Sequence, residues 1–324
     1  MLAIQLVLPY DGTMQTTFGI RVVTLLAVAV AGCLHANAQA PDVPICNQAG
    51  GETQSQSRIL DEARKIFTGG KVLKLSQAKK QLKRSSCELS LADASKTKLS
   101  AREVCIAARR SHLRIGWLYL CDKCGKWHLR LAGGYALSRS GAAATCFHVV
   151  EPGSTLRDGC LVAVTESAAV FPVAEVLAAN RESDACIVRV VGEGFTPLAL
   201  NTNIYPGDTA YCYSDPAGRR DYFSAGIVNR FYLGGGPRTT GSRDGGGAVP
   251  MRMNVSTDWA PGSSGSAVLD ECGNAIGHVA KISTAREESA APAKDAHADK
   301  PTAMVFHEAV SARDVLRLIR PRND

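Results

Sequence analysis

The sequence lacks an apolar run long enough to form a stable membrane span. Its most apolar stretch, residues 22–31, follows Arg21 and is broken by Thr24, whereas a spanning helix needs about 20 apolar residues. The basic residues give a formal net charge of +7, and the densest group, residues 79–84, has no aromatic side chains among them. We therefore expect no membrane span and no nucleic-acid partner, and we interpret residues 79–84 as the solvent-facing side of a helix.

Motifs for phosphate, haem and complete zinc sites are also missing. The glycine-rich segment 234–247 lacks the Gly-Lys-Ser/Thr ending of a phosphate loop and is expected to be a surface loop. Cys121 and Cys124 have the spacing of a metal or haem motif, but no histidine follows Cys124 directly and no second Cys/His pair completes a zinc site. His128 or Cys105 could add a ligand, and a disulfide is the favoured alternative. We therefore expect no cofactor, with Cys121, Cys124 and His128 as weak metal candidates.

The first forty residues, 1–40, have the pattern of a secretory signal peptide. Small residues alternate at 36–40 after the apolar run, and a start at Met14 would give a leader of ordinary length. This pattern predicts a secreted or periplasmic protein. The Val-Ala-Gly-Cys segment at 30–33 is similar to a bacterial lipobox, so the alternative is a lipid anchor at Cys33 and a membrane-tethered protein. Export favours disulfides, and ten of the eleven cysteines remain when Cys33 is set aside.

Residues 41–112 predict a linker followed by a small helical region. The polar segment 41–58 is expected to be the linker. The spacing of apolar residues predicts three helices, at 59–67, 75–82 and 99–112. The last of these begins with a capping box at Ser100, and a bridge between Cys87 and Cys105 is a possible staple. The expected role of this region is a structural cap or pro-region without chemistry.

The pattern changes at residue 113, and residues 113–324 are expected to form one all-β domain. Short runs of β-branched and aromatic residues alternate with Gly, Pro and Asp turns, which is typical of a barrel or sandwich. The runs lie at 115–120, 143–150, 161–164, 186–191, 209–213, 224–228, 251–255, 267–269 and 275–282. A polar loop at 285–300 and a helix at 311–319 are expected after them.

Three segments of this domain carry residues suited to acyl transfer. Ser264 lies in the Gly/Ser cluster 260–268, where a tight turn can aim its hydroxyl and the N–H groups of Gly262 and Ser264 at one point, as an oxyanion hole. His148 follows a run of small residues, and a histidine with pKa near ~6.5 can accept the serine proton and return it. Asp184 directly precedes an apolar strand and can orient the imidazole. Taken alone, each has a simpler interpretation as a loop, core, surface or turn residue.

The order of these residues favours one class of hydrolase. The chain places histidine first, aspartate second and serine third. An α/β-hydrolase would have serine, acid and histidine, and a subtilisin-like enzyme would have aspartate, histidine and serine. Only the chymotrypsin order fits, and the all-β pattern agrees with it independently.

Residues 113–320 resemble the trypsin-like peptidases of the chymotrypsin clan, in particular the HtrA/Deg-like and glutamyl-endopeptidase-like branches. The resemblance rests on segments 145–150, 184–188 and 260–266, and less specifically on 226–228. It implies two six-stranded β-barrels, with the triad residues His148 and Asp184 from the first barrel and Ser264 from the second. It also implies that the strand around residues 278–282 pairs with the substrate backbone, which makes His278, Val279 and Ala280 expected substrate-binding residues.

The sequence departs from the family pattern at several points. Ser263 stands where digestive trypsins have an aspartate that pairs with a new N-terminus, so activation by that route is not expected. No PDZ domain is expected after the peptidase domain, and Ala267 replaces a common proline. Asp258, six residues before Ser264, occupies the place of the acid that binds Arg or Lys in trypsin, but a turn or solvent-facing carboxylate is the simpler interpretation.

These observations predict an exported serine endopeptidase that acts on protein or peptide substrates through His148, Asp184 and Ser264. Two alternatives remain open. The first is a catalytically weak module that keeps the fold and binds extended peptides. The second is a metal-binding scaffold centred on Cys121 and Cys124.

Overall fold

The computed structural model describes residues 51–70, 72–154, 156–234, 249–286 and 302–321. The expected signal peptide, the lipobox with Cys33, almost all of the glycine-rich segment and most of the polar loop at 285–300 lie outside the described residues. In the described part of the chain, no helix is both long and apolar enough to cross a membrane.

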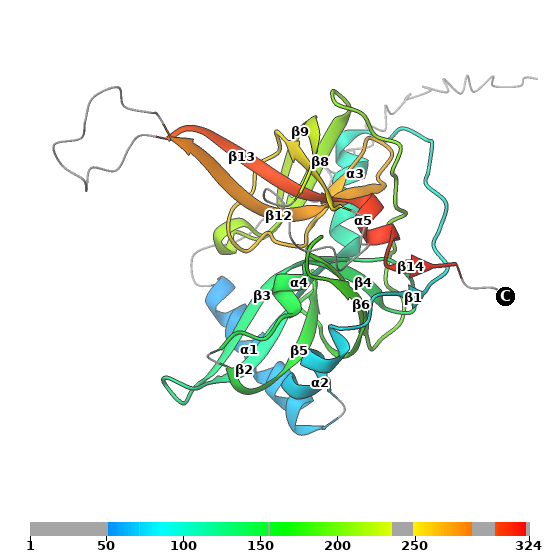
Figure 1. Cartoon of the computed structure of the whole chain (residues 1–324). Helices are drawn as coiled ribbons and strands as arrows, with labels where there is room; N and C mark the ends of the chain where they lie inside the picture. Colours follow the sequence, from blue (N-terminus) through cyan, green and yellow to red (C-terminus); the bar gives the residue numbers. More distant parts are fainter. Residues whose placement is uncertain (1–50, 71, 155, 235–248, 287–301, 322–324) are drawn as a thin grey trace, which may run out of the picture. The chain divides into compact units, whose positions relative to one another are not determined.

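The first of two closed antiparallel β-barrels contains six strands in the order β2-β3-β4-β7-β6-β5 (Figure 1). The strands are β2 (His112–Cys121), β3 (Trp127–Ala136), β4 (Ala142–Thr145), β5 (Leu156–Thr165), β6 (Val170–Asn180) and β7 (Ala185–Val190). Apolar side chains such as Ile115, Leu161 and Val188 fill its interior, because alternate residues of each strand point inward.

The second barrel also contains six strands, in the order β10-β13-β12-β11-β8-β9. These are β8 (Thr209–Ser214), β9 (Tyr222–Leu233), β10 (Met251–Val255), β11 (Ala267–Leu269), β12 (Ala275–Arg286) and β13 (Thr302–Ser311). Its core includes Met253, Val268 and Ile276. In Figure 1, β12 and β13 continue beyond the barrel as a long hairpin. Two six-stranded barrels confirm the fold class predicted from the sequence.

Helices from both ends of the described chain cover the barrels. Helices α1 (Gly51–Thr68) and α2 (Leu75–Gln81) pack against β5 and β6 of the first barrel. Helix α3 (Ala101–Ser111) packs against β8 and β11 of the second barrel, and its N-terminus has the predicted reciprocal bonds between Ser100 and Glu103. Helix α5 (Ala312–Leu316) follows β13, and the short strands β1 (Cys87–Glu88) and β14 (Ile319–Arg320) pair in parallel. Helix α1 begins at Gly51, inside the stretch 41–58 that was expected to be a linker.

Two expectations about local structure need correction. The run 143–150 is not one strand: β4 ends at Thr145, and α4 (Phe147–Val150) forms a single helical turn. The chain turns there because the N–H groups of Val149 and Glu151 bond back to the carbonyls of Cys146 and Phe147. Strands β3, β6 and β13 were not among the expected runs.

The expected disulfides are not formed in the described part of the chain. All nine cysteines described there are free, Cys87 and Cys105 included. Four of them, Cys146, Cys160, Cys186 and Cys212, are buried. These four behave as small apolar side chains of the cores, and burial raises the pKa of each of their thiols.

Candidate active site

His148 lies on the helical turn α4 at the rim of the first barrel. The turn is anchored by the N–H of Phe147, which donates to the carbonyl of Asp184 (3.2 Å), and by the indole of Trp117, which donates to the carbonyl of Val150 (3.2 Å). The imidazole Nδ1 lies 2.9 Å and 3.1 Å from the two carboxylate oxygens of Asp184. The side chain of His148 is 44% exposed, so the far side of its ring remains accessible.

Asp184 occupies the last position before β7, as the sequence predicted. Its backbone has a left-handed φ of 56°, a conformation that Asp and Asn tolerate better than other non-glycine residues. Its carboxylate also accepts the backbone N–H of His148 (3.0 Å). Burial acts to raise the pKa of Asp184, but the hydrogen bonds and charge of His148 outweigh it and hold the pKa below the ordinary value.

An ionised Asp184 determines which nitrogen of His148 carries the proton. A carboxylate only accepts hydrogen bonds, so the Nδ1 of His148 must be protonated to bond with it. The Nε2 of a neutral imidazole then keeps its lone pair. This arrangement leaves a proton acceptor on the accessible side of the ring.

Ser264 belongs to a loop of the second barrel that docks onto the first. The carbonyl of Ser264 accepts the N–H of Gly133 in β3 (2.7 Å), and the N–H of Gly265 donates to the carbonyl of Val279 (2.8 Å). Ser264 and His148 line the same cavity of about 180 Å³. Among the described residues no hydrogen bond joins the two side chains, and catalytic hydrogen bonds are often long before substrate binds.

The backbone of the same loop provides two unused donors. Within the described residues, the N–H groups of Gly262 and Ser264 donate to no protein acceptor. Gly262 has a φ of 105°, and a Cβ there would lie 2.9 Å from the carbonyl oxygen of Asp215. Only glycine fits this position without strain. Free backbone N–H groups of this kind are the donors from which an oxyanion hole can be built.

A family model matches the part of the chain that contains His148, Asp184 and Ser264. Residues 133–277 match the family described as the trypsin-like peptidase domain. Over these residues the chain is similar to trypsin-like peptidase domains. The crystal structure of the serine endoprotease from Yersinia pestis is similar over 68% of this chain, with 12% sequence identity and a TM-score of 0.46, and the match spans 66% of that structure's own length. A comparison with curated proteins finds no match.

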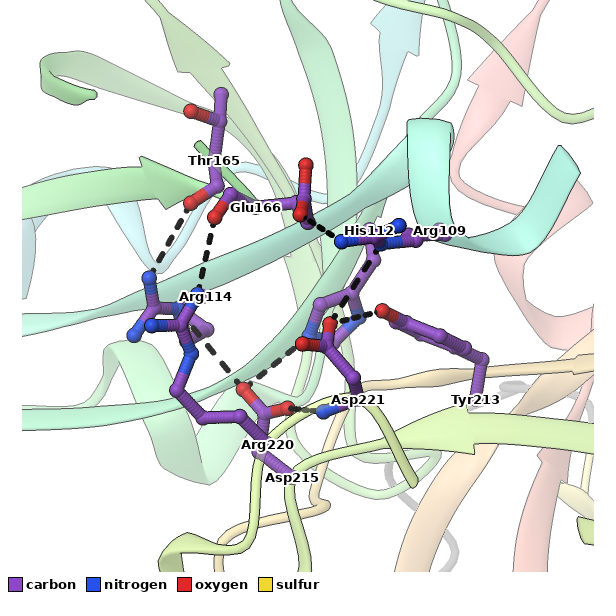
Figure 2. A network of polar contacts seen from close by, with 9 residues as sticks. All are labelled: Arg109, His112, Arg114, Thr165, Glu166, Tyr213, Asp215, Arg220 and Asp221. Carbon is purple, nitrogen blue, oxygen red and sulfur yellow. Dashed lines mark hydrogen bonds and ion pairs between the residues drawn. The ribbon is translucent and has the colours of Figure 1, made fainter. Parts of the chain in front are cut away.

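A polar network fixes the turn next to the Ser264 loop (Figure 2). The turn Pro216–Gly218 contacts the loop through the N–H of Ala217, which donates to the carbonyl of Pro261 (2.8 Å). The carboxylate of Asp215 faces two side chains of β2 in the first barrel, His112 (3.6 Å) and Arg114 (3.8 Å). Burial acts to raise the pKa of Asp215, but these neighbours and the N–H of Asp221 hold it below the ordinary value.

The network continues outward and joins both barrels to α3. Arg109 of α3 pairs with Glu166, and its Nε lies 3.9 Å from Asp221. The hydroxyl of Tyr213 also donates to Asp221, and Arg220 donates to the carbonyl of Glu166 (2.9 Å). The sequence analysis missed this network because its residues are far apart along the chain.

The network explains how the loop is held although Ser263 replaces the aspartate of digestive trypsins. Ser263 is fully buried and its hydroxyl has no partner among the described residues. It therefore supplies no ion pair to the loop. The turn after Asp215 contacts the loop at Pro261 instead.

The four expected substrate-binding residues occupy different environments. Asp258 is exposed, and its N–H and carbonyl bond to the hydroxyl of Ser224. His278 is fully buried in β12, and its Nε2 lies 3.3 Å from the carbonyl of Asp184. The N–H and carbonyl of Val279 are both used to hold the Ser264 loop. Ala280 lies at a bulge of β12 and lines a cavity with His148 and Asp184.

The cavity beside Ala280 has a volume of about 410 Å³ and contains charged groups that the sequence analysis did not single out. Its lining includes Tyr232, Arg252, Lys281 and Glu308. These residues come from four different strands of the second barrel, β9, β10, β12 and β13. The sequence shows only that each of these residues lies in a strand with alternating polar and apolar residues. This pattern does not tell at which end of the barrel a side chain lies.

The three weak metal candidates lie together. Cys121, Cys124 and His128 form one cluster at the tip of the β2–β3 hairpin. Cys105, the other possible ligand, is on α3 and is not part of the cluster. Cys146, His148 and Asp184 form a second group of this kind, in which the Cys146 thiol donates to the carbonyl of Val279 (3.1 Å).

Proposed function

We propose that this protein is a serine endopeptidase in which Ser264 is the nucleophile, His148 the general base and Asp184 the residue that orients His148. The observation that carries the proposal is the placement of Ser264 in one cavity with a His148 whose Nδ1 is bonded to Asp184. This leaves Nε2 as the base that can face the serine hydroxyl.

The proposed reaction follows from these positions. The Ser264 oxygen attacks the carbonyl carbon of the scissile peptide bond while Nε2 of His148 takes the hydroxyl proton. The N–H groups of Gly262 and Ser264 stabilise the negative oxygen of the tetrahedral intermediate. His148 then gives the proton to the leaving amine, and water hydrolyses the acyl-enzyme by the reverse sequence of proton transfers.

The substrate in this proposal is an extended peptide. The strand β12 pairs with β11 only as far as His278, so its edge near Ala280 and Lys281 is the place for strand addition. Part of that edge is covered, because the indole of Trp259 donates to the carbonyl of Lys281 (3.3 Å). The proposed pairing position is therefore Ala280, which lines a cavity with His148 and Asp184.

A fluorophosphonate probe tests the proposal, because it reacts with an activated serine. We expect the purified chain to be labelled at Ser264, as identified by mass spectrometry of the modified peptide. Ser264→Ala should abolish labelling, a loss of about 10⁶-fold being typical when a triad serine is removed. Ser140→Ala is the matched control, since Ser140 lies in an exposed turn and lines neither of the cavities that contain His148, and it should label like the wild type.

The same experiment distinguishes a serine endopeptidase from a catalytically weak module that binds extended peptides. A wild-type chain that takes up no probe, or a Ser264→Ala chain that is labelled equally, would rule out the enzyme. If the unlabelled chain still bound extended peptides, the protein would be a peptide-binding module with the same fold.

Export is part of the same proposal and rests on the N-terminal sequence. Cleavage within residues 36–40 would release the protein, whereas a lipid-modified Cys33 would tether it. Expression of the full chain in a bacterial host, followed by fractionation and N-terminal sequencing, distinguishes the two. An uncleaved protein in the cytoplasm would contradict both.

A further inference from the structure

The tip of the β2–β3 hairpin carries two cysteines and a histidine that the proposed peptidase chemistry does not use. Cys121 is the last residue of β2, Cys124 lies in the turn, and His128 is the second residue of β3. Their ligating atoms all lie within 4.8 Å of one another. The Sγ of Cys124 is 3.0 Å from Nε2 of His128.

Backbone hydrogen bonds close the turn between Cys121 and Lys126, and some of them reach the sulfur of Cys121. The N–H of Cys121 donates to the carbonyl of Lys126 (2.9 Å), and the N–H of Gly125 donates to the carbonyl of Cys121 (3.0 Å). The N–H groups of Cys124 and Lys123 donate to the Cys121 sulfur. Backbone N–H groups aimed at this sulfur hold it beside the ligating atoms of the other two side chains of the cluster.

We propose that Cys121, Cys124 and His128 bind a Zn²⁺ ion. Two thiolates and an imidazole are ligands that zinc prefers, and water completes a tetrahedral site. Zinc binds sulfur at about 2.3 Å and histidine nitrogen at about 2.0–2.1 Å, so ligands already within 4.8 Å of one another need only a small adjustment of a surface turn. Binding releases the two thiol protons to solvent.

The position of the cluster gives the ion a structural role beside the cleft. The same two strands contribute Tyr119 and Arg130 to the wall of the cavity that contains His148 and Ser264. The ring of Tyr119 lies 5.5 Å from that of His128. An ion that joins Cys121 to His128 therefore fixes the end of the hairpin that forms this wall.

Metal binding is measured on the full chain, purified under reducing conditions and freed of metal. With Zn²⁺ we expect one tight equivalent per chain, and with Co²⁺ the absorption of a tetrahedral thiolate complex. Cys121→Ser and Cys124→Ser should each weaken zinc binding by more than about 100-fold, since even changes outside the ligand shell cost 10–100-fold. His128→Ala should lose the same equivalent.

Two control variants make the test specific. Cys272→Ser replaces a half-exposed cysteine of the second barrel and should keep the zinc equivalent. His148→Ala removes the histidine of the second cysteine–histidine–carboxylate group and should keep it as well. The proposal is overturned if the reduced chain binds no zinc, if binding survives Cys121→Ser, if His148→Ala abolishes it, or if a second preparation made without reductant contains a Cys121–Cys124 disulfide. The readout is metal content, so it does not depend on peptidase activity.

Discussion

Asp184 combines a left-handed backbone with a charged side chain that accepts two hydrogen bonds from His148. Asp184→Asn should therefore keep the fold, because asparagine tolerates the same backbone conformation. Its amide can donate to Nδ1 and so favours the wrong tautomer of His148. We expect the rate of fluorophosphonate labelling to fall about 10³–10⁴-fold with little change in Tm.

Asp184→Ala is the matched comparison for this prediction. Alanine removes the carboxylate and also resists the left-handed backbone, at a cost of about 1–2 kcal/mol. It should lower both the labelling rate and Tm. A fully active Asp184→Asn chain would show that the carboxylate does not orient His148.

His278 makes stability depend on pH below neutrality. Full burial lowers the pKa of His278 to about 4, although Asp184 acts in the opposite direction. The unfolded chain binds this proton near pH ~6.5, so between these values the unfolded state holds more protons. The free energy of unfolding should therefore fall as the pH falls from about 6.5 to 4, by about 3 kcal/mol from this residue alone.

Urea unfolding at a series of pH values measures this effect. His278→Gln retains a donor for the carbonyl of Asp184 but has no proton to bind. It should show a shallower fall in stability between pH 6.5 and 4 than the wild type. Equal slopes in the two chains would mean that His278 is not the titrating group.

The three proposed triad residues could be predicted from the sequence only together, because none of them stands out alone. His148, Asp184 and Ser264 were identified by their order, and the structure places His148 against Asp184 and in one cavity with Ser264. Cys146 and Asp215 were missed because a buried thiol and a turn carboxylate have no sequence signature. Their roles depend on residues of the other barrel, which spacing along the chain cannot bring together.

Among the elements, β3 makes a contact that positions the Ser264 loop. Gly133 donates to the carbonyl of Ser264 (2.7 Å), and a Cβ at Gly133 would lie 2.0 Å from the hydroxyl oxygen of Ser266. Gly133→Ala should push the loop away, with a loss of about 1–3 kcal/mol in stability. A displacement of about 1 Å can cost 10²-fold in rate, so labelling of Ser264 should slow by about that factor.

Gly69→Ala serves as the control for this prediction. Gly69 directly follows α1, and a Cβ there would make only ordinary contacts, the nearest at 3.4 Å from the carbonyl oxygen of Ile66. This variant should label at the wild-type rate. An unchanged rate in Gly133→Ala would show that the loop tolerates the intrusion and that β3 does not position Ser264.

The elements missed by the sequence analysis share a physical cause. Strand β3 contains two adjacent glycines, Gly133 and Gly134, and β6 contains Pro172, residues that weaken a strand pattern. Both are strands because the barrel pairs them on two sides. The run 143–150 looked like one strand because its small and apolar residues suit both β4 and the buried side of α4.

On the scale of the whole molecule, the residues proposed to be catalytic depend on contacts that cross between the barrels. The core shared by the two barrels includes Tyr135 and Ile187 from the first and Tyr213 and Leu269 from the second. The network around Asp215 crosses the same boundary. The two-barrel fold could be predicted from the pattern of short strands and from the family resemblance. The contacts between the barrels could not, because they form only when both barrels are folded and packed together.

The helical region before the barrels is the least conspicuous part of the sequence and contributes directly to the first barrel. Ile59 and Leu73 are almost fully buried, and the N–H of Leu73 donates to the carbonyl of Val173 in β6 (3.1 Å). Arg84 pairs with Glu175 (2.8 Å) on the same strand. Burial of one large apolar side chain contributes about 1.5–3 kcal/mol, so a chain that starts at residue 85 should lose roughly 3–6 kcal/mol of stability.

Urea unfolding and size-exclusion chromatography of the shortened chain test whether this region is integral. If the chain without residues 1–84 is too unstable to purify, Leu73→Ala in the full chain measures the same contact, with an expected loss of about 2–5 kcal/mol. A shortened chain that unfolds at the same urea concentration as the full one would make the region a detachable pro-segment. We expect the shortened chain to unfold at a lower urea concentration. The helical region contributes side chains to the core of the first barrel and bonds to β6, so its removal exposes part of that core to water.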